Sequence, residues 1–202
     1  MNNNKELETL QDIKMMMERS SRFISLSGWS GIAAGCCALI GAAIAYPIVA
    51  DRHLREDLYT TKEVKCLLLI ALCTFVAALV SAFFFTYVRS KRINVPIWSN
   101  TSKRLSWSVA VPIVAGGIFL LKMISLGFFG LVAPGCLIFY GVALFTGSKQ
   151  TLDEIKYLGY AEILLGCVSL CFLGYGLLFW AIGFGLFHIL YGIWMWMKYE
   201  RK

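Results

Sequence analysis

The sequence predicts an all-α polytopic membrane protein: a bundle of six transmembrane helices preceded by a short cytoplasmic amphipathic helix. Two observations lead to this prediction. The chain of 202 residues is 58% hydrophobic and only 15% charged, whereas soluble domains are about 45–50% apolar and about 25% charged. The apolar residues also gather into runs long enough for helices of about 20 residues, the length that crosses a bilayer.

Six segments of the chain reach that length. The expected spans are approximately 23–50, 66–88, 105–121, 127–145, 157–174 and 177–197, which together form a membrane domain of residues 23–197. The third and fourth spans lie in one apolar run that is too long for a single crossing, so we expect a hairpin near Lys122–Gly127. The fifth and sixth spans share another run, with a turn expected near Gly174–Gly176. Within the fourth span, Pro134 is expected to kink the helix.

The basic residues are divided unequally between the two sides of this bundle. Of the 19 Lys and Arg residues, 14 lie in the N-terminal segment, the 89–104 loop, the 147–156 loop and the C-terminus. Loops rich in Lys and Arg remain in the cytoplasm. Both termini are therefore expected to be cytoplasmic, as residues 1–22 and as a tail of residues 198–202.

The N-terminal segment has the pattern of an amphipathic helix. Apolar side chains recur at helical spacing along residues 7–17, at Leu7, Leu10, Ile13 and Met17. Three interpretations of this helix stay open: packing on the bundle, docking onto a partner, or lying in the lipid interface. The candidate contacts for a partner or for lipid phosphates are Arg19, Arg22, Arg89, Lys91, Arg92, Lys103 and Arg104.

Glu162 is the only acidic residue well inside any long apolar run. His188 lies in the next span, and a hairpin centred on Tyr175 would put both residues at the same depth. Such a pair would hold or share a proton. Two structural interpretations stay open: one hydrogen bond that fixes helix packing, or separate partners, with Glu162 reaching Arg89 or Arg104 and His188 bonding a carbonyl.

Catalytic motifs are absent from the sequence. It contains no HExxH, GxSxG or Walker-type loop, so we expect no enzyme and no catalytic residue. The seven cysteines lie in or beside apolar runs without a CxxC, and we therefore expect neither a metal site nor a cofactor. Topology accounts for the positive charge, which excludes nucleic acid as the expected partner. The expected partners are the lipid bilayer, a cytoplasmic protein and a second copy of the chain.

The segment MMERSSRFISLSG, which ends at Gly28 and runs directly into the first span, carries a resemblance. It resembles the start of a family of small bacterial six-span integral membrane proteins with no established activity. The resemblance implies a multi-pass protein of the bacterial inner (plasma) membrane. The family is one often encoded beside a small winged-helix regulator, which implies a cytoplasmic partner, and it supplies no catalytic residues.

Two functions are compatible with these features. The leading hypothesis is a non-enzymatic membrane protein that acts by protein contacts, as a regulatory or scaffold component. It rests on the amphipathic N-terminus and on the absence of catalytic motifs. The alternative is a small proton-coupled transporter or channel that uses Glu162 and His188.

Overall fold

The computed structural model describes residues 27–55, 59–94 and 98–201, and every regular element within these ranges is a helix. The elements in chain order are α2 (Gly28–Arg55), α3 (Thr61–Arg92), α4 (Asn100–Ser125), η1 (Phe129–Leu131), α5 (Val132–Gly147), η2 (Ser148–Gln150), α6 (Ile155–Leu170), η3 (Leu173–Tyr175), α7 (Gly176–Trp180), η4 (Ala181–Phe187) and α8 (His188–Tyr199). Three of the short elements are 3₁₀ turns, whereas η4 is a π-helix. The expected amphipathic helix, with Arg19 and Arg22, lies outside the described residues.

Five helical segments are long and apolar enough to cross a membrane. They are Gly28–Asp51, Thr61–Arg92, Asn100–Ser125, Phe129–Gln150 and Leu173–Tyr199. The all-α class is thus confirmed over the described ranges, and the five segments indicate a membrane-embedded protein. The segment expected to be the fifth span is shorter than predicted, because α6 has 16 residues and ends at Leu170.

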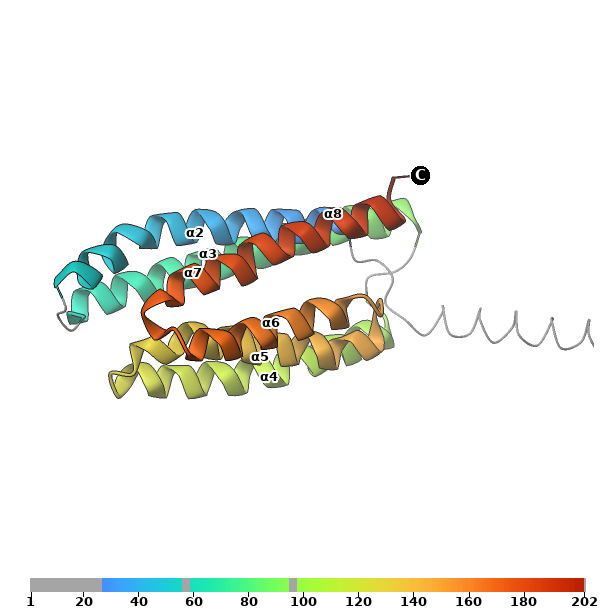
Figure 1. Cartoon of the computed structure of the whole chain (residues 1–202). Coiled ribbons are helices and arrows are strands. Elements are labelled where there is room, and N and C mark those ends of the chain that lie inside the picture. The colour runs from blue at the N-terminus through green and yellow to red at the C-terminus, as the bar shows by residue number, and fades with distance from the viewer. Residues whose placement is uncertain (1–26, 56–58, 95–97, 202) are drawn as a thin grey trace, which may run out of the picture.

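The helices form two groups (Figure 1). In one group α2 packs on α3 and α8, and in the other α5 packs on α4 and α6. The last helical stretch joins the groups, since α7 lies against α5 and η4 contacts both α2 and α6. The chain ends where α2 begins and α3 finishes, and we call this the terminal end of the bundle.

Turn chemistry and proline placement explain the hairpin between α4 and α5. The chain reverses just after α4, where Gly127 has a φ of +84° that a residue with a side chain rarely adopts. Pro134 lies in the first turn of α5, a position where the missing N–H has no helical acceptor to lose. Pro134 is thus the third residue of α5 and interrupts none of its hydrogen bonds, so its position gives no reason for the expected kink.

Glycines bring the helix backbones into direct contact. A Cβ on Gly31 of α2 would lie 3.1 Å from the His188 carbonyl oxygen, and one on Gly192 would lie 2.6 Å from the Gly28 carbonyl oxygen. On the other side, a Cβ on Gly159 of α6 would lie 2.8 Å from the carbonyl oxygen of Gly141 in α5. Small residues allow this close packing of apolar helices. It fixes α8 against α2 and α6 against α5, and so sets the position of the side chains between them.

Candidate functional site

Glu162 is completely buried, with 0% of its surface exposed. It lies on the face of α6 that also buries Leu158, Gly166 and Ser169, because these residues recur at helical spacing. Neither oxygen of its carboxyl group has a hydrogen-bond partner among the described residues. The alternative in which Glu162 reaches Arg89 or Arg104 is therefore wrong.

The His188 side chain faces this carboxyl group. Its Nδ1 lies 3.5 Å from Oε1 of Glu162 and 3.0 Å from the carbonyl oxygen of Gly183. The structure thus brings together the two residues that the sequence analysis paired. It also contains the hydrogen bond from His188 to a backbone carbonyl group that the competing interpretation expected.

The hydrogen bonds of His188 define its neutral form. A carbonyl oxygen only accepts, so Nδ1 carries a hydrogen and donates it to Gly183. The other ring nitrogen, Nε2, lies 2.7 Å from the Tyr140 hydroxyl and accepts its hydrogen. A second proton on the ring would convert Nε2 into a donor and place a positive charge beside Glu162.

The π-helix η4 supplies the space and the carbonyl group for this arrangement. A Cβ on Gly183 would lie 2.5 Å from Oε2 of Glu162, so only glycine leaves room for the carboxyl group. The turn after α6 also comes earlier than predicted, which places Glu162 opposite Gly183. His188 still reaches it, because helical side chains lean towards the N-terminus of their helix. Single π-helical segments within α-helices are frequent at functional sites.

Tyr140, which α5 contributes, is the member of the site that sequence reasoning missed. Its ring centroid lies 5.0 Å from that of Phe184 and 5.3 Å from that of His188. Phe184 also stacks on His188 at 6.0 Å and contacts Trp180 at 5.2 Å. The aromatic rings therefore form a continuous series from Trp180 to His188.

A second acid–base cluster joins the start of α6 to the end of α8, at the terminal end of the bundle. Lys198 and Tyr199 of α8 both donate hydrogen bonds to Oε1 of Glu154, at 2.5 and 2.6 Å. Partial burial alone would raise the pKa of the Glu154 carboxyl group, but these two hydrogen bonds outweigh it and lower that pKa below its ordinary value. Between the clusters lies Tyr191, whose buried hydroxyl has no hydrogen-bond partner among the residues described.

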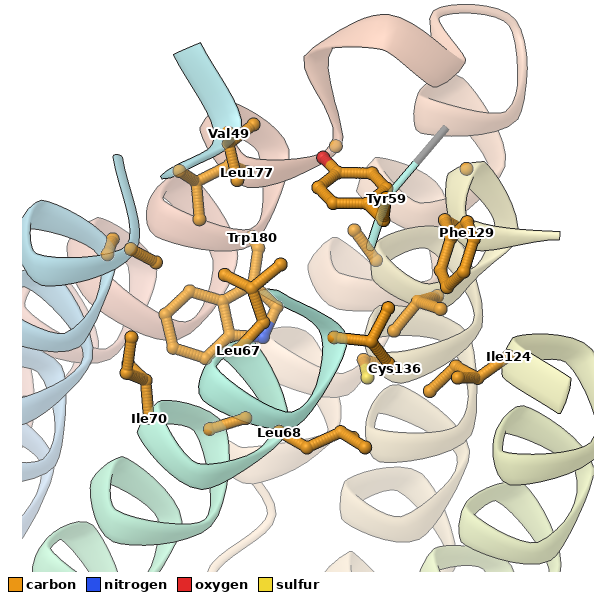
Figure 2. A pocket seen from close by; sticks show the side chains of 18 of the residues that line it. Val49, Tyr59, Leu67, Leu68, Ile70, Ile124, Phe129, Cys136, Leu177 and Trp180 are labelled. Atoms are coloured by element: carbon orange, nitrogen blue, oxygen red, sulfur yellow. The ribbon is translucent and has the colours of Figure 1, made fainter. Parts of the chain in front are cut away.

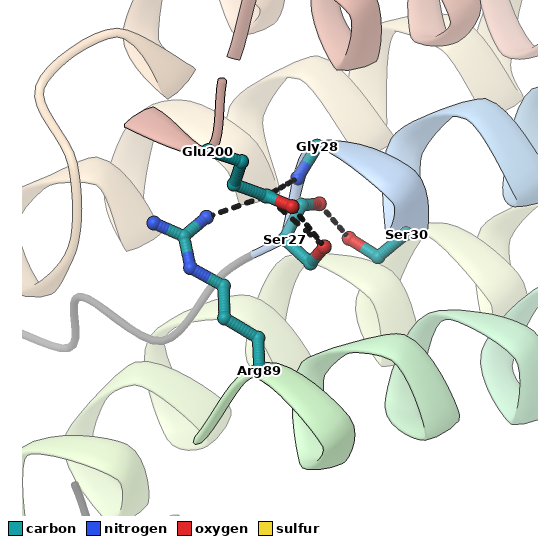
Figure 3. A network of polar contacts seen from close by, with 5 residues as sticks. All are labelled: Ser27, Gly28, Ser30, Arg89 and Glu200. Atoms are coloured by element: carbon teal, nitrogen blue, oxygen red, sulfur yellow. Dashed lines mark hydrogen bonds and ion pairs between the residues drawn. The ribbon is translucent and has the colours of Figure 1, made fainter. Parts of the chain in front are cut away.

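Glu200 ties three helix ends together, as Figure 3 shows. Its Oε1 accepts hydrogen bonds from the Gly28 N–H at 2.6 Å and from the Ser27 hydroxyl at 3.1 Å. The same oxygen pairs with Arg89 at 2.7 Å. A carboxylate at the start of a helix also interacts favourably with the helix dipole.

The predicted contact residues therefore differ in their surroundings. Arg89 forms a partly buried ion pair with Glu200, and Arg19 and Arg22 lie outside the described residues. The other four, Lys91, Arg92, Lys103 and Arg104, are exposed near the terminal end.

The cysteines do not form a cluster. All seven are free, and within the described ranges no three His, Cys, Asp or Glu side chains are grouped as metal ligands.

Comparisons with protein-family models, with curated proteins and with solved structures find no match to this chain. Over the described ranges, the fold and the site indicate the class: an all-helical protein with helices apolar enough to be membrane-embedded and with a buried carboxyl–imidazole pair.

Proposed function

We propose that the protein is a small proton-coupled transporter in which Glu162 and His188 bind and release the proton. One observation carries the proposal: the carboxyl group of Glu162 is fully buried, lies 3.5 Å from an imidazole nitrogen and has no hydrogen-bond partner among the described residues. A glutamate that only joined two helices would be expected to make that hydrogen bond, because an unsatisfied buried polar group costs about 1–3 kcal/mol. Retaining an ionisable group within a membrane at this cost favours a role in proton transfer.

The site has two states of protonation. With Glu162 protonated and His188 neutral, the buried face of α6 carries no charge and packs against η4. When Glu162 loses its proton, the carboxylate requires a cation or water, because an uncompensated buried charge is strongly unfavourable. A proton supplied to Nε2 through the Tyr140 hydroxyl would provide that cation, and opening between α6 and η4 would provide water. Protonation can thereby bias the protein between a closed and an open arrangement.

We further propose six spans in the bacterial inner membrane, with both termini in the cytoplasm. The short α6 packs along α5 and runs beside it in Figure 1, and at about 1.5 Å per residue its 16 residues cover about 24 Å. The orientation rests on the 14 of 19 Lys and Arg residues expected on the side of the termini.

The test of the proton site measures the protonation of Glu162 directly. Infrared difference spectra of the reconstituted protein in acidic and alkaline buffer should show a carboxyl band that disappears in Glu162→Gln. The matched control is Asp153→Asn, an exposed carboxyl group, which should retain the band. In vesicles loaded with the pH dye pyranine, an inside-negative potential should acidify wild-type vesicles faster than Glu162→Gln vesicles. A spectrum without a Glu162-dependent band would contradict the proposal.

A second candidate function is contact with a cytoplasmic protein. The observation that favours it is the set of exposed basic side chains near the terminal end, Lys91, Arg92, Lys103 and Arg104. Their charge favours an acidic partner, and residues 1–22 would add a mixed-charge segment with four basic and four acidic side chains. Deletion of residues 1–18 should then abolish capture of the partner and leave the melting temperature of the bundle unchanged.

A further inference from the structure

A cavity of about 490 Å³ lies between the two helix groups, towards the end of the bundle opposite the terminal end (Figure 2). Its walls come from α2, α3, η1, α5 and α7, so both groups contribute to it. Its volume falls in the range of about 300–1,000 Å³ that is typical of small-molecule sites.

The lining of the cavity selects for an uncharged molecule. All of the residues that line it are uncharged, and most are aliphatic. Three aromatic residues also line it: Tyr59 just before α3, Phe129 in η1 and Trp180 in α7. An ion entering this space would lose hydration and gain no opposite charge, whereas an aromatic ring would gain stacking contacts.

Trp180 connects the cavity to the proton site. It lines the cavity as the last residue of α7, and the π-helix η4 begins at the next residue. Its ring contacts Phe184, which stacks on His188. An occupant that displaces Trp180 would therefore move the start of η4, and with it the Gly183 carbonyl group beside Glu162.

We propose that this cavity is the substrate site and that it takes a neutral, largely apolar molecule containing an aromatic ring. The proposal rests on the proposed transport function, because it assigns a substrate class to the proposed transporter. Binding against Trp180 favours one position of η4 and so changes the ease with which Glu162 loses its proton. The affinity for the substrate must then depend on the protonation of Glu162, because coupling between two sites is reciprocal.

The probe for this site is N-phenyl-1-naphthylamine, a neutral aromatic compound that fluoresces in apolar surroundings. Ala71→Phe on α3 places a larger side chain in the cavity wall. Ala77→Phe is the matched control, because Ala77 is exposed on the same helix and does not line the cavity. In the full-length protein in detergent, wild type and Ala77→Phe should bind the probe saturably, and Ala71→Phe should bind it at least about tenfold more weakly. Trp180→Phe should lower energy transfer from the protein to the probe.

The outcomes test two claims separately: that the cavity binds the probe, and that this binding is coupled to the protonation of Glu162. Equal binding by Ala71→Phe and wild type would overturn the site. A phospholipid that co-purifies with wild type but not with Ala71→Phe, without saturable probe binding, would assign the cavity to an acyl chain and also overturn it. Probe affinity that changes with pH in wild type but not in Glu162→Gln supports the coupling. Cavity-dependent affinity that is independent of pH would overturn the coupling, and the infrared band of Glu162 independently tests the proton site.

Discussion

Nδ1 of His188 lies 3.5 Å from Oε1 of Glu162, and the glutamate has no exposed surface. The two residues come from helices of antiparallel direction, and each is held by a different neighbour. Close packing of α6 on α5 through Gly159 positions the glutamate, whereas Tyr140 and the Gly183 carbonyl group orient the imidazole. The positions of the two side chains are therefore set by contacts with α5 and η4.

Tyr140→Phe is predicted to remove the hydrogen bond to Nε2 of His188 and to keep the ring packing. The substitution leaves a buried acceptor unsatisfied, which should lower the free energy of unfolding by about 1–2 kcal/mol. It should also slow proton exchange at Glu162, measured as the rate at which its infrared band shifts in deuterated buffer. Tyr160→Phe is the control, because Tyr160 is 51% exposed and its ring contacts that of Phe145. Equal exchange rates in the two variants would show that Tyr140 has no part in proton transfer.

The features that could be predicted from the sequence are those that depend on local composition. The five membrane-length segments follow from apolar length alone, and Glu162 and His188 stood out because ionisable residues are rare in such segments. The end of α6 could not be predicted, because Cys171 and Phe172 are as apolar as the helix that they terminate. In the structure the chain turns after Leu170, and the following helix α7 packs against α5.

The missed residues depend on tertiary contacts. Tyrosine is ordinary in a membrane helix, so Tyr140 carried no signal until α5 was placed beside α8. Arg89 and Glu200 are 111 residues apart, and each fitted a simpler interpretation, a basic loop and a charged tail. Their pairing depends on where α3 and α8 both end.

Gly183→Ala is predicted to displace the Glu162 carboxyl group. Its Cβ would lie 2.5 Å from Oε2 and would also contact Leu137. Overpacking of this kind costs about 1–3 kcal/mol, and the infrared band of Glu162 should shift or broaden. Gly117→Ala is the control: nothing lies within 4 Å of its Cβ, and alanine is favoured over glycine within a helix by about 0.5–1 kcal/mol. An unchanged Glu162 band in Gly183→Ala would show that the carboxyl group is not confined by this glycine.

Glu200→Gln is predicted to destabilise the terminal end of the bundle. The substitution removes the charge that pairs with Arg89 and that caps the N–H of Gly28. Hydrogen bonds to charged groups contribute about 1.5–3 kcal/mol, so the melting temperature in detergent should fall. Arg201→Gln, on the exposed neighbouring residue, should leave it unchanged. If Arg89→Gln and Glu200→Gln were fully additive in the double variant, the two residues would not be coupled.

The proposed topology of six spans predicts that the two ends of α6 lie on opposite sides of the membrane. In a protein whose other cysteines are replaced, Cys171 should react with an impermeant maleimide from outside the cell. A single cysteine at Asp153 should react only after permeabilisation. Cysteines at Ser125 and Lys103 provide the outside and inside references. Labelling of Cys171 and of the Asp153 position from the same side would show that α6 does not cross.

Glu154 is predicted to make stability depend on pH in the acidic range. Hydrogen bonds from Lys198 and Tyr199 lower the pKa of its carboxyl group below the ordinary value of 4.5. A group whose pKa is lower in the folded state contributes stability above its unfolded pKa, and this contribution is lost as the pH falls through the folded value. Glu154→Gln should therefore lower the melting temperature at pH 7, and the difference from wild type should shrink steadily below pH 4.5. Thermal unfolding across this range measures it, with Asp153→Asn as a neighbouring control. A difference that stayed constant down to the lowest pH would show that the carboxylate charge does not stabilise this end of α6.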